Sequence, residues 1–399
     1  MTMTTAAPAS GRLAPAQTRI GSVDILRGVV MVLMAIDHVR VYSGVPAGGP
    51  DPGVFLTRWI THFCAPAFVF FAGTSAFLYG RKLLRDGMPS DLMAGTVARY
   101  LAIRGLILVV LEFTVIRASW TFHFDYSSFL LAGVIWMLGC CMILLAALVW
   151  LPIRALAAIA LGLILFQQVF AAIGSALPPF LQPVWEFIYP IGAEVILGAN
   201  GPTVAVLYSI VPWIGVMAAG YAFGAILVRP AVERDRLCLR IGLTATGLFL
   251  LVGGAAVLLD APNEAPALLR LLNQSKYPAS QLFLMMTLGP AIALIPLAER
   301  ATGRIAAVFS VFGRVPMFYY LLHIPLIHAT ALVVWLLRDG TAGTDRFATA
   351  PYVSMPPPER WSLPLLYLVF AIVVALLYPA CRWYAAIKAR RSQGWLRYL

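Results

Sequence analysis

The stretch ILRGVVMVLMAIDHVRV at residues 25–41 decides the fold, because it is an apolar run that contains ionisable side chains. An ionisable group inside a membrane span is costly, so it is usually buried against protein and serves a function. Arg27 and His38 lie on one stripe of a helix, since the steps between them through two methionines are four, three and four. At ~1.5 Å per residue they are roughly 16 Å apart. This helix therefore presents a fixed cation near one side of the bilayer and a titratable imidazole near the other.

The composition is that of a polytopic membrane protein. Of the 399 residues 61% are hydrophobic and only 12% are charged, and the mean hydropathy is +0.86. Soluble domains are about half apolar and about a quarter charged. The formal net charge is +12, but no basic run with interleaved aromatics is present, so no nucleic-acid partner is expected. The five cysteines lie in or beside apolar runs without metal-like spacing, which indicates buried free thiols and no metal site.

Apolar windows of ~20 residues predict an all-α protein with about ten transmembrane helices. These are expected at 22–43, 55–80, 95–116, 127–150, 153–175, 204–228, 239–259, 280–298, 311–337 and 362–386. The stretch 176–203 is interrupted by prolines and is expected to form a loop at the membrane interface. Residues 1–18 are predicted to be a disordered cytoplasmic tail, 19–388 the transmembrane domain and 389–399 a basic cytoplasmic tail.

The arginines and lysines predict the orientation of these helices. If ten helices alternate, the cations after the second, fourth, sixth, eighth and tenth helices fall on one side, together with Arg12 and Arg19. The opposite loops carry fewer cations, and 176–203 carries none. Because cytoplasmic loops are enriched in Lys and Arg, both termini are predicted to be cytoplasmic. With this orientation all five histidines lie at the midplane or beyond it.

His38 is the candidate general base, because an imidazole suits deprotonation of an amine or a hydroxyl near neutral pH. Adjacent helical residues diverge by ~100°, so Asp37 is poorly placed to orient His38. His62 on the antiparallel second helix is therefore the expected partner of His38, and Arg58 lies one turn away from it. The alternative is an interfacial histidine that is merely hydrogen-bonded to a neighbour. A metal site formed by Asp37, His38 and His62 is not favoured by their spacing.

The ninth helix has features of a helix that lines a cavity. Pro316 and Pro325 each free a backbone carbonyl and favour kinks. Tyr320 and His323 share a face at three-residue spacing. His323 either lines the path of a transferred group or ties two helices together, and the residues leave both interpretations open.

Two further sets of charged residues have alternative interpretations. Arg27 either faces a phosphate-bearing ligand at the inner mouth or pairs with Asp24, three residues earlier. Lys276 and Tyr277 precede the eighth helix on the outer side, where they either contact a polar acceptor or anchor the helix at the interface. No P-loop, dinucleotide fingerprint, metalloprotease motif or nucleophile elbow is present.

Four parts of the chain resemble one family. The run Arg-x-x-Ser-x-Asp-x-x-Arg-Gly-x-x-Met-x-Leu-Met-x-x-Asp-His at 19–38 resembles the heparan-α-glucosaminide N-acetyltransferase catalytic-domain family. The stretches FLTRWITHFCAP with FFAGTS (55–66, 70–75), KYPAS with MTLGP (276–280, 286–290), and the ninth-helix run at 312–328 look like its bacterial members. The resemblance implies a multi-helix enzyme that takes acetyl from cytosolic acetyl-CoA and delivers it to a glucosamine-type amine across the membrane. For a bacterial member it implies the inner (plasma) membrane.

The resemblance carries over to particular residues only in part. Asp37 and His38 match the polar end of the family's first-helix motif. The lysosomal enzyme has an asparagine where this chain has His38, and its proposed catalytic histidine lies in the following loop. No histidine stands between His38 and His62 here, so that role does not transfer directly.

The leading hypothesis is a membrane-embedded acyltransferase. Arginine suits phosphate by its planar geometry, and the CoA-binding candidates are Arg27, Arg104, Arg314, Tyr320 and His323. The catalytic candidates are Asp37, His38 and His62. The candidates for contact with a carbohydrate or amino-sugar acceptor are Arg58, Lys276, Tyr277 and His328.

Several questions stay open at this level. Direct transfer and an acyl-enzyme are both compatible with the residues, and so is a homodimer. A proton-coupled transporter is the alternative function, although it would predict inverted repeats, and none is convincing here. A non-catalytic scaffold would have little need for an aligned Arg27 and His38.

Overall fold

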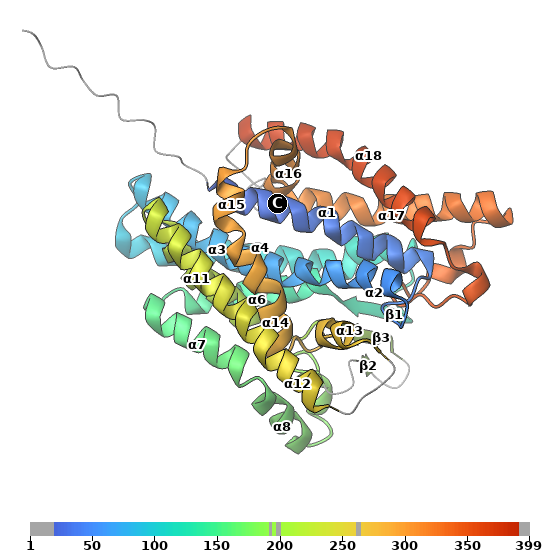
Figure 1. Ribbon diagram of the computed structural model, residues 1–399, viewed down its shortest axis with the longest axis horizontal. Coiled ribbons are helices and arrows are strands. Elements are labelled where there is room, and N and C mark those ends of the chain that lie inside the picture. Colours follow the sequence, from blue (N-terminus) through green and yellow to red (C-terminus); the bar gives the residue numbers. More distant parts are fainter. Residues whose placement is uncertain (1–19, 191–193, 197–200, 261–264, 391–399) are drawn as a thin grey trace, which may run out of the picture.

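A computed structural model describes residues 20–190, 194–196, 201–260 and 265–390. The predicted tail 1–18 lies outside the described residues, and so does all of the predicted tail 389–399 except its first two residues, which end the last helix. The described chain is mostly helical, with 75% helix and 3% strand (Figure 1).

The first half of the chain forms helices α1 (Gly21–Ser43), α2 (Pro52–Trp59), the 3₁₀ helix η1 (Ile60–Phe63), α3 (Cys64–Arg85), α4 (Ser90–Leu111), the π-helix η2 (Glu112–Ile116), α5 (Arg117–Thr121), α6 (Val134–Leu148), α7 (Ile153–Leu165), α8 (Gln168–Ala176) and α9 (Gln182–Trp185). The second half forms α10 (Trp213–Leu227), α11 (Ala231–Leu248), the π-helix η3 (Phe249–Gly253), α12 (Gly254–Leu259), α13 (Ala267–Leu272), α14 (Gln281–Ala293), α15 (Ile295–Arg300), α16 (Arg304–Arg314), α17 (Pro316–Asp339), the 3₁₀ helices η4 (Thr344–Phe347) and η5 (Pro357–Glu359), and α18 (Leu363–Arg390). The strands are β1 (Phe129–Ala132), β2 (Glu194–Ile196) and β3 (Thr203–Val206).

Helix α1 lies against α15, α16, α17, α18 and α3 (Figure 1). Its closest approach is to α16. A Cβ atom on Gly28 would lie 1.8 Å from the carbonyl oxygen of Phe309, and one on Gly313 would lie 1.8 Å from that of Asp24. Small residues let helix backbones touch in this way inside a membrane. The crossing fixes the N-terminal end of α1, which carries Arg27, against the end of α16.

Glycines also bring the backbones of three other helix pairs close together. A Cβ on Gly73 of α3 would lie 1.9 Å from a backbone oxygen of α10, and one on Gly105 of α4 would lie 2.5 Å from a backbone oxygen of α6. Gly242 of α11 approaches α14, with 2.5 Å to the backbone nitrogen of Ala293. Because α3 also contacts α4 and α10 also contacts α6, these four helices form one wall of the bundle.

A small three-stranded sheet corrects the purely helical expectation. The strand order is β1-β3-β2, with β1 and β3 parallel (Phe129 opposite Thr203) and β2 and β3 antiparallel (Val195 opposite Val204). As a result α6 begins at residue 134 rather than 127, and α10 at 213 rather than 204. The expected interfacial loop contains α9 and β2. Short apolar runs do not distinguish a strand from a buried helix segment, which explains the error.

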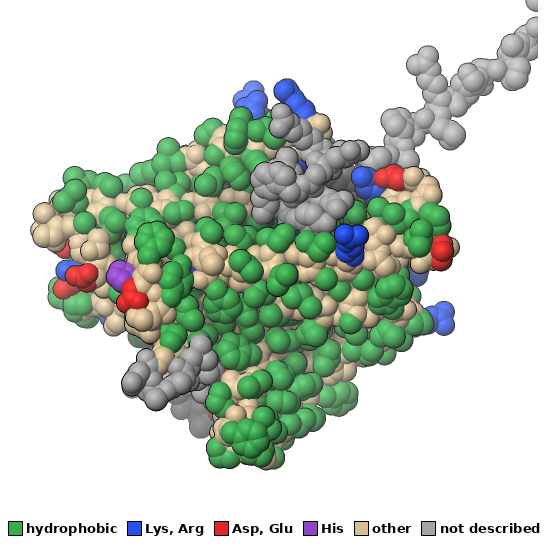
Figure 2. Space-filling model, turned by 180° about the vertical axis from the view of Figure 1, so that it is seen from behind, with side chains coloured by type: hydrophobic (Ala, Val, Ile, Leu, Met, Phe, Trp, Pro, Cys, Tyr) green, Lys and Arg blue, Asp and Glu red, His purple; other side chains and the backbone are tan. Residues whose placement is uncertain are grey.

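Within the residues that the structure describes, five helical segments are long and apolar enough to cross a membrane: Pro52–Arg85, Ala231–Leu259, Gln281–Arg300, Pro316–Asp339 and Leu363–Arg390. The pair α7–α8, bent by 65°, makes a sixth if it counts as one broken span, and α6 and α10 are shorter apolar helices. Hydrophobic side chains cover the middle of the face in Figure 2, while most charged ones lie toward its margins.

The ninth predicted helix is two helices. Helix α16 ends at Arg314, and α17 begins with Pro316 at its first position, where the missing amide hydrogen does no harm. Pro325 lies inside α17. The break therefore occurs at the first of the two prolines. The start of α1 and the end of α18 lie at the same end of the bundle (Figure 1).

Candidate functional site

A cavity lies inside the bundle between α1, α3, α4, α6 and α17. Its volume is about 190 Å³. Arg27 and Arg104 line it together with Asp37, His38 and Lys276, and most of its wall is apolar. Arg27 and His38 are eleven residues apart on α1, which is roughly 16 Å at 1.5 Å per residue. One cavity therefore extends from Arg27 and Arg104 to His38.

His38 takes part in a relay of two imidazoles. Its Nδ1 lies 2.6 Å from Nε2 of His323, and Nδ1 of His323 lies 2.7 Å from the carbonyl oxygen of Tyr320. A carbonyl only accepts, so Nδ1 of His323 carries the hydrogen and its Nε2 accepts from His38. His38 therefore donates through Nδ1, and its Nε2 keeps the basic lone pair. This is the tautomer that a general base needs.

The surroundings of His38 fix its ring. The Trp120 ring meets it edge-on, with 4.8 Å between centroids, and the ring of Tyr320 lies 6.2 Å away. His323 is fully buried behind it. His323 thus contacts His38 rather than the ligand space, which favours the interpretation of a polar tie between α1 and α17 over direct contact with a transferred group.

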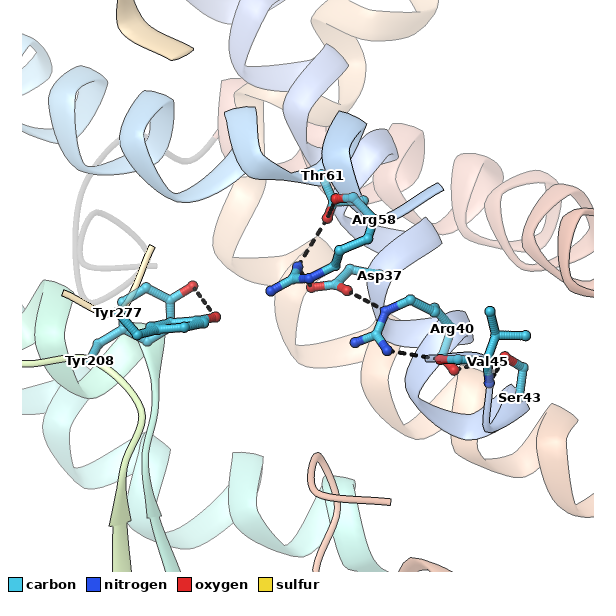
Figure 3. Close-up of polar contacts among 8 residues, drawn as sticks. All are labelled: Asp37, Arg40, Ser43, Val45, Arg58, Thr61, Tyr208 and Tyr277. Atoms are coloured by element: carbon cyan, nitrogen blue, oxygen red, sulfur yellow. Dashed lines mark hydrogen bonds and ion pairs between the residues drawn. The ribbon is translucent and has the colours of Figure 1, made fainter. Parts of the chain in front are cut away.

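Asp37 is held by two arginines (Figure 3). Its Oδ1 accepts from Nε of Arg40 at 2.9 Å, and its Oδ2 accepts from Nη1 of Arg58 at 2.7 Å. Arg58 also donates to the hydroxyl of Thr61 at 3.1 Å, and that hydroxyl donates to the Arg58 carbonyl at 2.7 Å. Asp37 therefore joins α1 to the α2–η1 segment. Within the described part of the chain, no hydrogen bond links its carboxylate to His38, as the helical geometry predicts.

His62 is not the partner of His38, so the expected pair is wrong. The hydrogen-bond partner of His38 is His323. Among the described residues, Nδ1 of His62 has no hydrogen-bond partner, and its ring packs on Phe283 with 5.4 Å between centroids. The reason is local, because His62 lies in the 3₁₀ helix η1, whose tighter winding turns its side chain away from the direction that a continuous α-helix would give.

The structure brings two of the three predicted inner arginines to the cavity. Arg27 donates to the hydroxyl of Ser75 at 2.6 Å and to the carbonyl of Phe71 at 3.2 Å. Arg104 donates through Nη1 to the hydroxyl of Tyr100 at 2.7 Å, while its buried Nε has no partner among the described residues. Arg314 is exposed at the end of α16 and is not part of the cavity wall.

Some of the residues that were predicted for the outer side line the cavity, and others do not. Lys276 is only 7% exposed and lines the cavity, and Tyr320 lines it too. Tyr277 lies beside Tyr208, with 3.5 Å between their hydroxyls. Figure 3 shows both tyrosines across from the Arg58 guanidinium.

His328 lies outside the cavity. It is fully buried, and its ring stacks on Phe122 with 3.8 Å between centroids. Its Nδ1 lies 3.3 Å from the carbonyl oxygen of Ser119. The aromatic packing around it indicates a structural histidine rather than one that contacts an acceptor.

Glu112 is a buried acid that the sequence interpretation missed. Its side chain is 1% exposed, and its Oε2 accepts from the backbone N–H groups of Ile135 and Trp136 at 2.9 Å each. It thus accepts hydrogen bonds from two backbone N–H groups at the start of α6, which have no partner within the helix. The acid stands in the apolar run Leu106–Ile116, so the rule that pointed to His38 would also have found it. Within the described part of the chain, no group of three or more His, Cys, Asp or Glu residues has the geometry of a metal site.

An apolar helical bundle with a mostly apolar internal cavity that a few charged side chains line is typical of a membrane protein with a ligand site between its helices. Residues 19–259 match the family model described as heparan-alpha-glucosaminide N-acetyltransferase, catalytic. The match covers more than half of the chain, and the chain belongs to this family. Membership implies that it is an acyltransferase. No curated protein matches the chain. His323 and Lys276 follow the matched residues, so their place beside His38 is known from the structure alone.

Proposed function

We propose that this protein moves an acetyl group from cytosolic acetyl-CoA, or another acyl group from its acyl-CoA, to an amine or hydroxyl of a sugar-type acceptor on the outer side of the membrane. The observation that carries the proposal is the single cavity with Arg27 and Arg104 in one half and the His38 relay in the other. Family membership supports the same reaction class.

The inner half of the cavity suits the donor. Arginine guanidinium groups pair well with phosphate because they are planar and always charged. Arg27 is held in place by Ser75, and Arg104 by Tyr100, so both present fixed charge to a ligand. The wall between them and His38 contains Met31 and Met34, which suit the apolar part of an extended thioester arm. The thioester carbonyl would then lie near His38.

The outer half suits the chemical step. His38 Nε2 accepts a proton from the amine or hydroxyl of the acceptor as that atom attacks the thioester carbonyl. The new C–N or C–O bond forms, the C–S bond breaks, and the CoA thiolate leaves with the proton from His38. His323 accepts from Nδ1 of His38 throughout and keeps the basic nitrogen toward the acceptor. Alignment of the two substrates and base catalysis together supply the rate.

The proposal includes an orientation. We place both termini in the cytoplasm, ten crossings in the membrane and the protein in the inner membrane of a bacterium. The clustering of Arg and Lys in alternate loops supports this orientation. The common position of the start of α1 and the end of α18 supports an even number of crossings (Figure 1).

The test is transfer by the purified protein from radiolabelled acetyl-CoA to a panel of amino sugars. His38→Ala should lower kcat by about 10²–10⁴, the usual contribution of a general base, while CoA binding persists. Added imidazole should restore part of the activity. His123→Ala, a change at an exposed histidine of an outer loop, is the matched control and should leave transfer unchanged. Absence of both transfer and CoA binding would refute the proposal, and full activity of His38→Ala would refute the role of His38.

A further inference from the structure

Lys276 is a buried cation without a counterion. It is 7% exposed and lines the outer half of the cavity. In the ranges that the structure describes, no carboxylate and no hydrogen-bond acceptor contacts its Nζ. Its nearest polar surroundings are two aromatic faces, Tyr208 at 5.5 Å and Tyr277 at 5.2 Å from Nζ to the ring centroid. Burying a charge is expensive unless the charge is paired.

The surrounding charges do not supply the missing anion. Three cations, Arg40, Arg58 and Lys276, gather at this end, and Asp37 is the carboxylate that faces them. Both oxygens of Asp37 are taken by the two arginines. The excess of positive charge lowers the pKa of the neighbouring Tyr277 phenol. Burial raises the pKa of the Tyr277 phenol, but Lys276 and Arg58 lower it by more, so that its pKa lies below the ordinary value.

We propose that Lys276 binds an anionic group of the acceptor: a carboxylate, a sulfate or a phosphate. This inference rests on the proposed function and adds the chemical class of the acceptor. Lys276 lines the same cavity as Asp37 and His38. The anion and the nucleophile therefore belong to one small molecule whose amine or hydroxyl reaches His38. The faces of Tyr208 and Tyr277 flank the same position and suit the apolar side of a sugar ring.

The donor does not explain this site. Phosphates of an acyl-CoA are assigned to Arg27 and Arg104, and Arg27 lies roughly 16 Å along α1 from His38 at 1.5 Å per residue. Lys276 stands in the half of the cavity that contains Asp37 and His38. A second, separate anion is needed to pair with it. The acceptor is the remaining substrate.

The experiment compares acceptors that share an amino-sugar core and differ in charge. Glucosamine is the reference because it carries no anionic group. Glucosamine 6-sulfate, glucosamine 6-phosphate and muramic acid each add one type of anion. We expect at least one anionic acceptor to exceed glucosamine in kcat/KM by about tenfold or more, in line with ~1.5–3 kcal/mol for a hydrogen bond to a charged group. The ranking of the three identifies the type of anion.

Substitutions of Lys276 test whether this residue causes the preference for an anionic acceptor. Lys276→Gln should lower kcat/KM for the preferred anionic acceptor about tenfold or more beyond any loss that it causes with glucosamine, and Lys276→Arg should restore most of the preference. Lys82→Gln is the matched control, because Lys82 is an exposed lysine at the end of α3. Equal losses with charged and uncharged acceptors would overturn the inference and assign Lys276 to the reacting carbonyl or to the fold. The absence of any anionic preference in the wild-type protein would overturn it as well.

A binding measurement without a donor tests the anion site independently of the transfer reaction. Without a donor, the preferred anionic sugar should raise the Tm of the wild-type protein in detergent and not that of Lys276→Gln. If no acceptor is ever acetylated but this stabilisation is present, the proposed function fails and the anion site stands. If transfer occurs and no anion stabilises the protein, the anion site fails and the proposed function stands.

Discussion

At the scale of single residues, the hydrogen bond between His38 and His323 joins positions 285 apart in the chain. His323→Leu removes the acceptor for Nδ1–H of His38, so the tautomer is no longer fixed. We expect kcat to fall by an order of magnitude or more, at most by the ~10²–10⁴ of general-base catalysis, with KM for both substrates little changed. His323→Gln keeps an acceptor oxygen and should retain more activity. Equal loss in the two variants would indicate that His323 serves only packing.

The sequence predicts one half of this relay and not the other. Arg27, Asp37 and His38 are found because charge within an apolar helix signals function. The partner of His38 depends on how α1 packs on α17, which no local pattern reveals. His62 was expected on the assumption of a continuous second helix, and η1 breaks that assumption.

Asp37 should matter for stability more than for chemistry. Asp37→Asn leaves the largely buried Arg58 without its counterion, and loss of one partner of a buried ion pair costs about 3–5 kcal/mol. We expect a lower Tm in detergent for Asp37→Asn and for Arg58→Gln, and a smaller combined loss in the double variant than the sum of the two. Asp86→Asn, in an exposed pair with Lys82, is the control and should change Tm little. A wild-type Tm in both single variants would contradict this role.

The lowered pKa of Tyr277 predicts how acceptor preference depends on pH. The phenol is neutral below its pKa and negative above it. A phenolate beside Lys276 competes with the anion of the acceptor, so the preference should be strongest at lower pH and fall as the pH rises through the pKa of Tyr277. The measurement is the ratio of kcat/KM for the preferred anionic acceptor to that for glucosamine, from neutral to alkaline pH. Tyr277→Phe should keep the ratio constant over this range, and the same decline in both proteins would rule out Tyr277 as its cause.

At the scale of elements, the crossing of α1 and α16 depends on glycine. Gly28→Ala places a Cβ 1.8 Å from the carbonyl oxygen of Phe309, so the two helices must move apart. We expect a loss of about 1–3 kcal/mol or more, as for other overpacked sites, and a lower Tm. Gly21→Ala is the control on the same helix, because nothing lies within 4 Å of its Cβ. Equal effects of the two substitutions would show that helix propensity rather than packing determines the result.

The elements also show where periodicity stops being informative. The long apolar runs correctly predict most of the helices. The segments Phe129–Ala132 and Thr203–Val206 are too short and too uniformly apolar to distinguish a strand from a helix. Their pairing is set by two positions 74 residues apart, Phe129 and Thr203, and hydropathy does not contain that information.

At the scale of the whole molecule, the number of crossings can be argued from the position of the chain ends. Five crossings would put the start of α1 and the end of α18 on opposite sides, yet the two lie at the same end of the bundle. Helix α1 itself is 23 residues long, which at 1.5 Å per residue is about 35 Å and exceeds a ~30 Å hydrocarbon core. Its charged residues make it less apolar than the five segments above. Asp37, Arg40 and Arg27 nevertheless form ion pairs or hydrogen bonds within the protein. A test by length and composition therefore leaves out α1, although α1 is long enough to cross and its charges are paired.

This argument makes a topological prediction. In a background in which the five native cysteines are replaced, Ser127→Cys in the loop before β1 should react with a membrane-impermeant maleimide in intact cells. Ser90→Cys, at the start of α4, should react only after the cells are permeabilised. Both serines are exposed and the substitutions are alike, so each serves as the control for the other. Labelling of both residues from the same side would mean that α4 does not cross the bilayer. It would also place Arg104 and His38 on one side, and the proposed transfer across the membrane would then have no path.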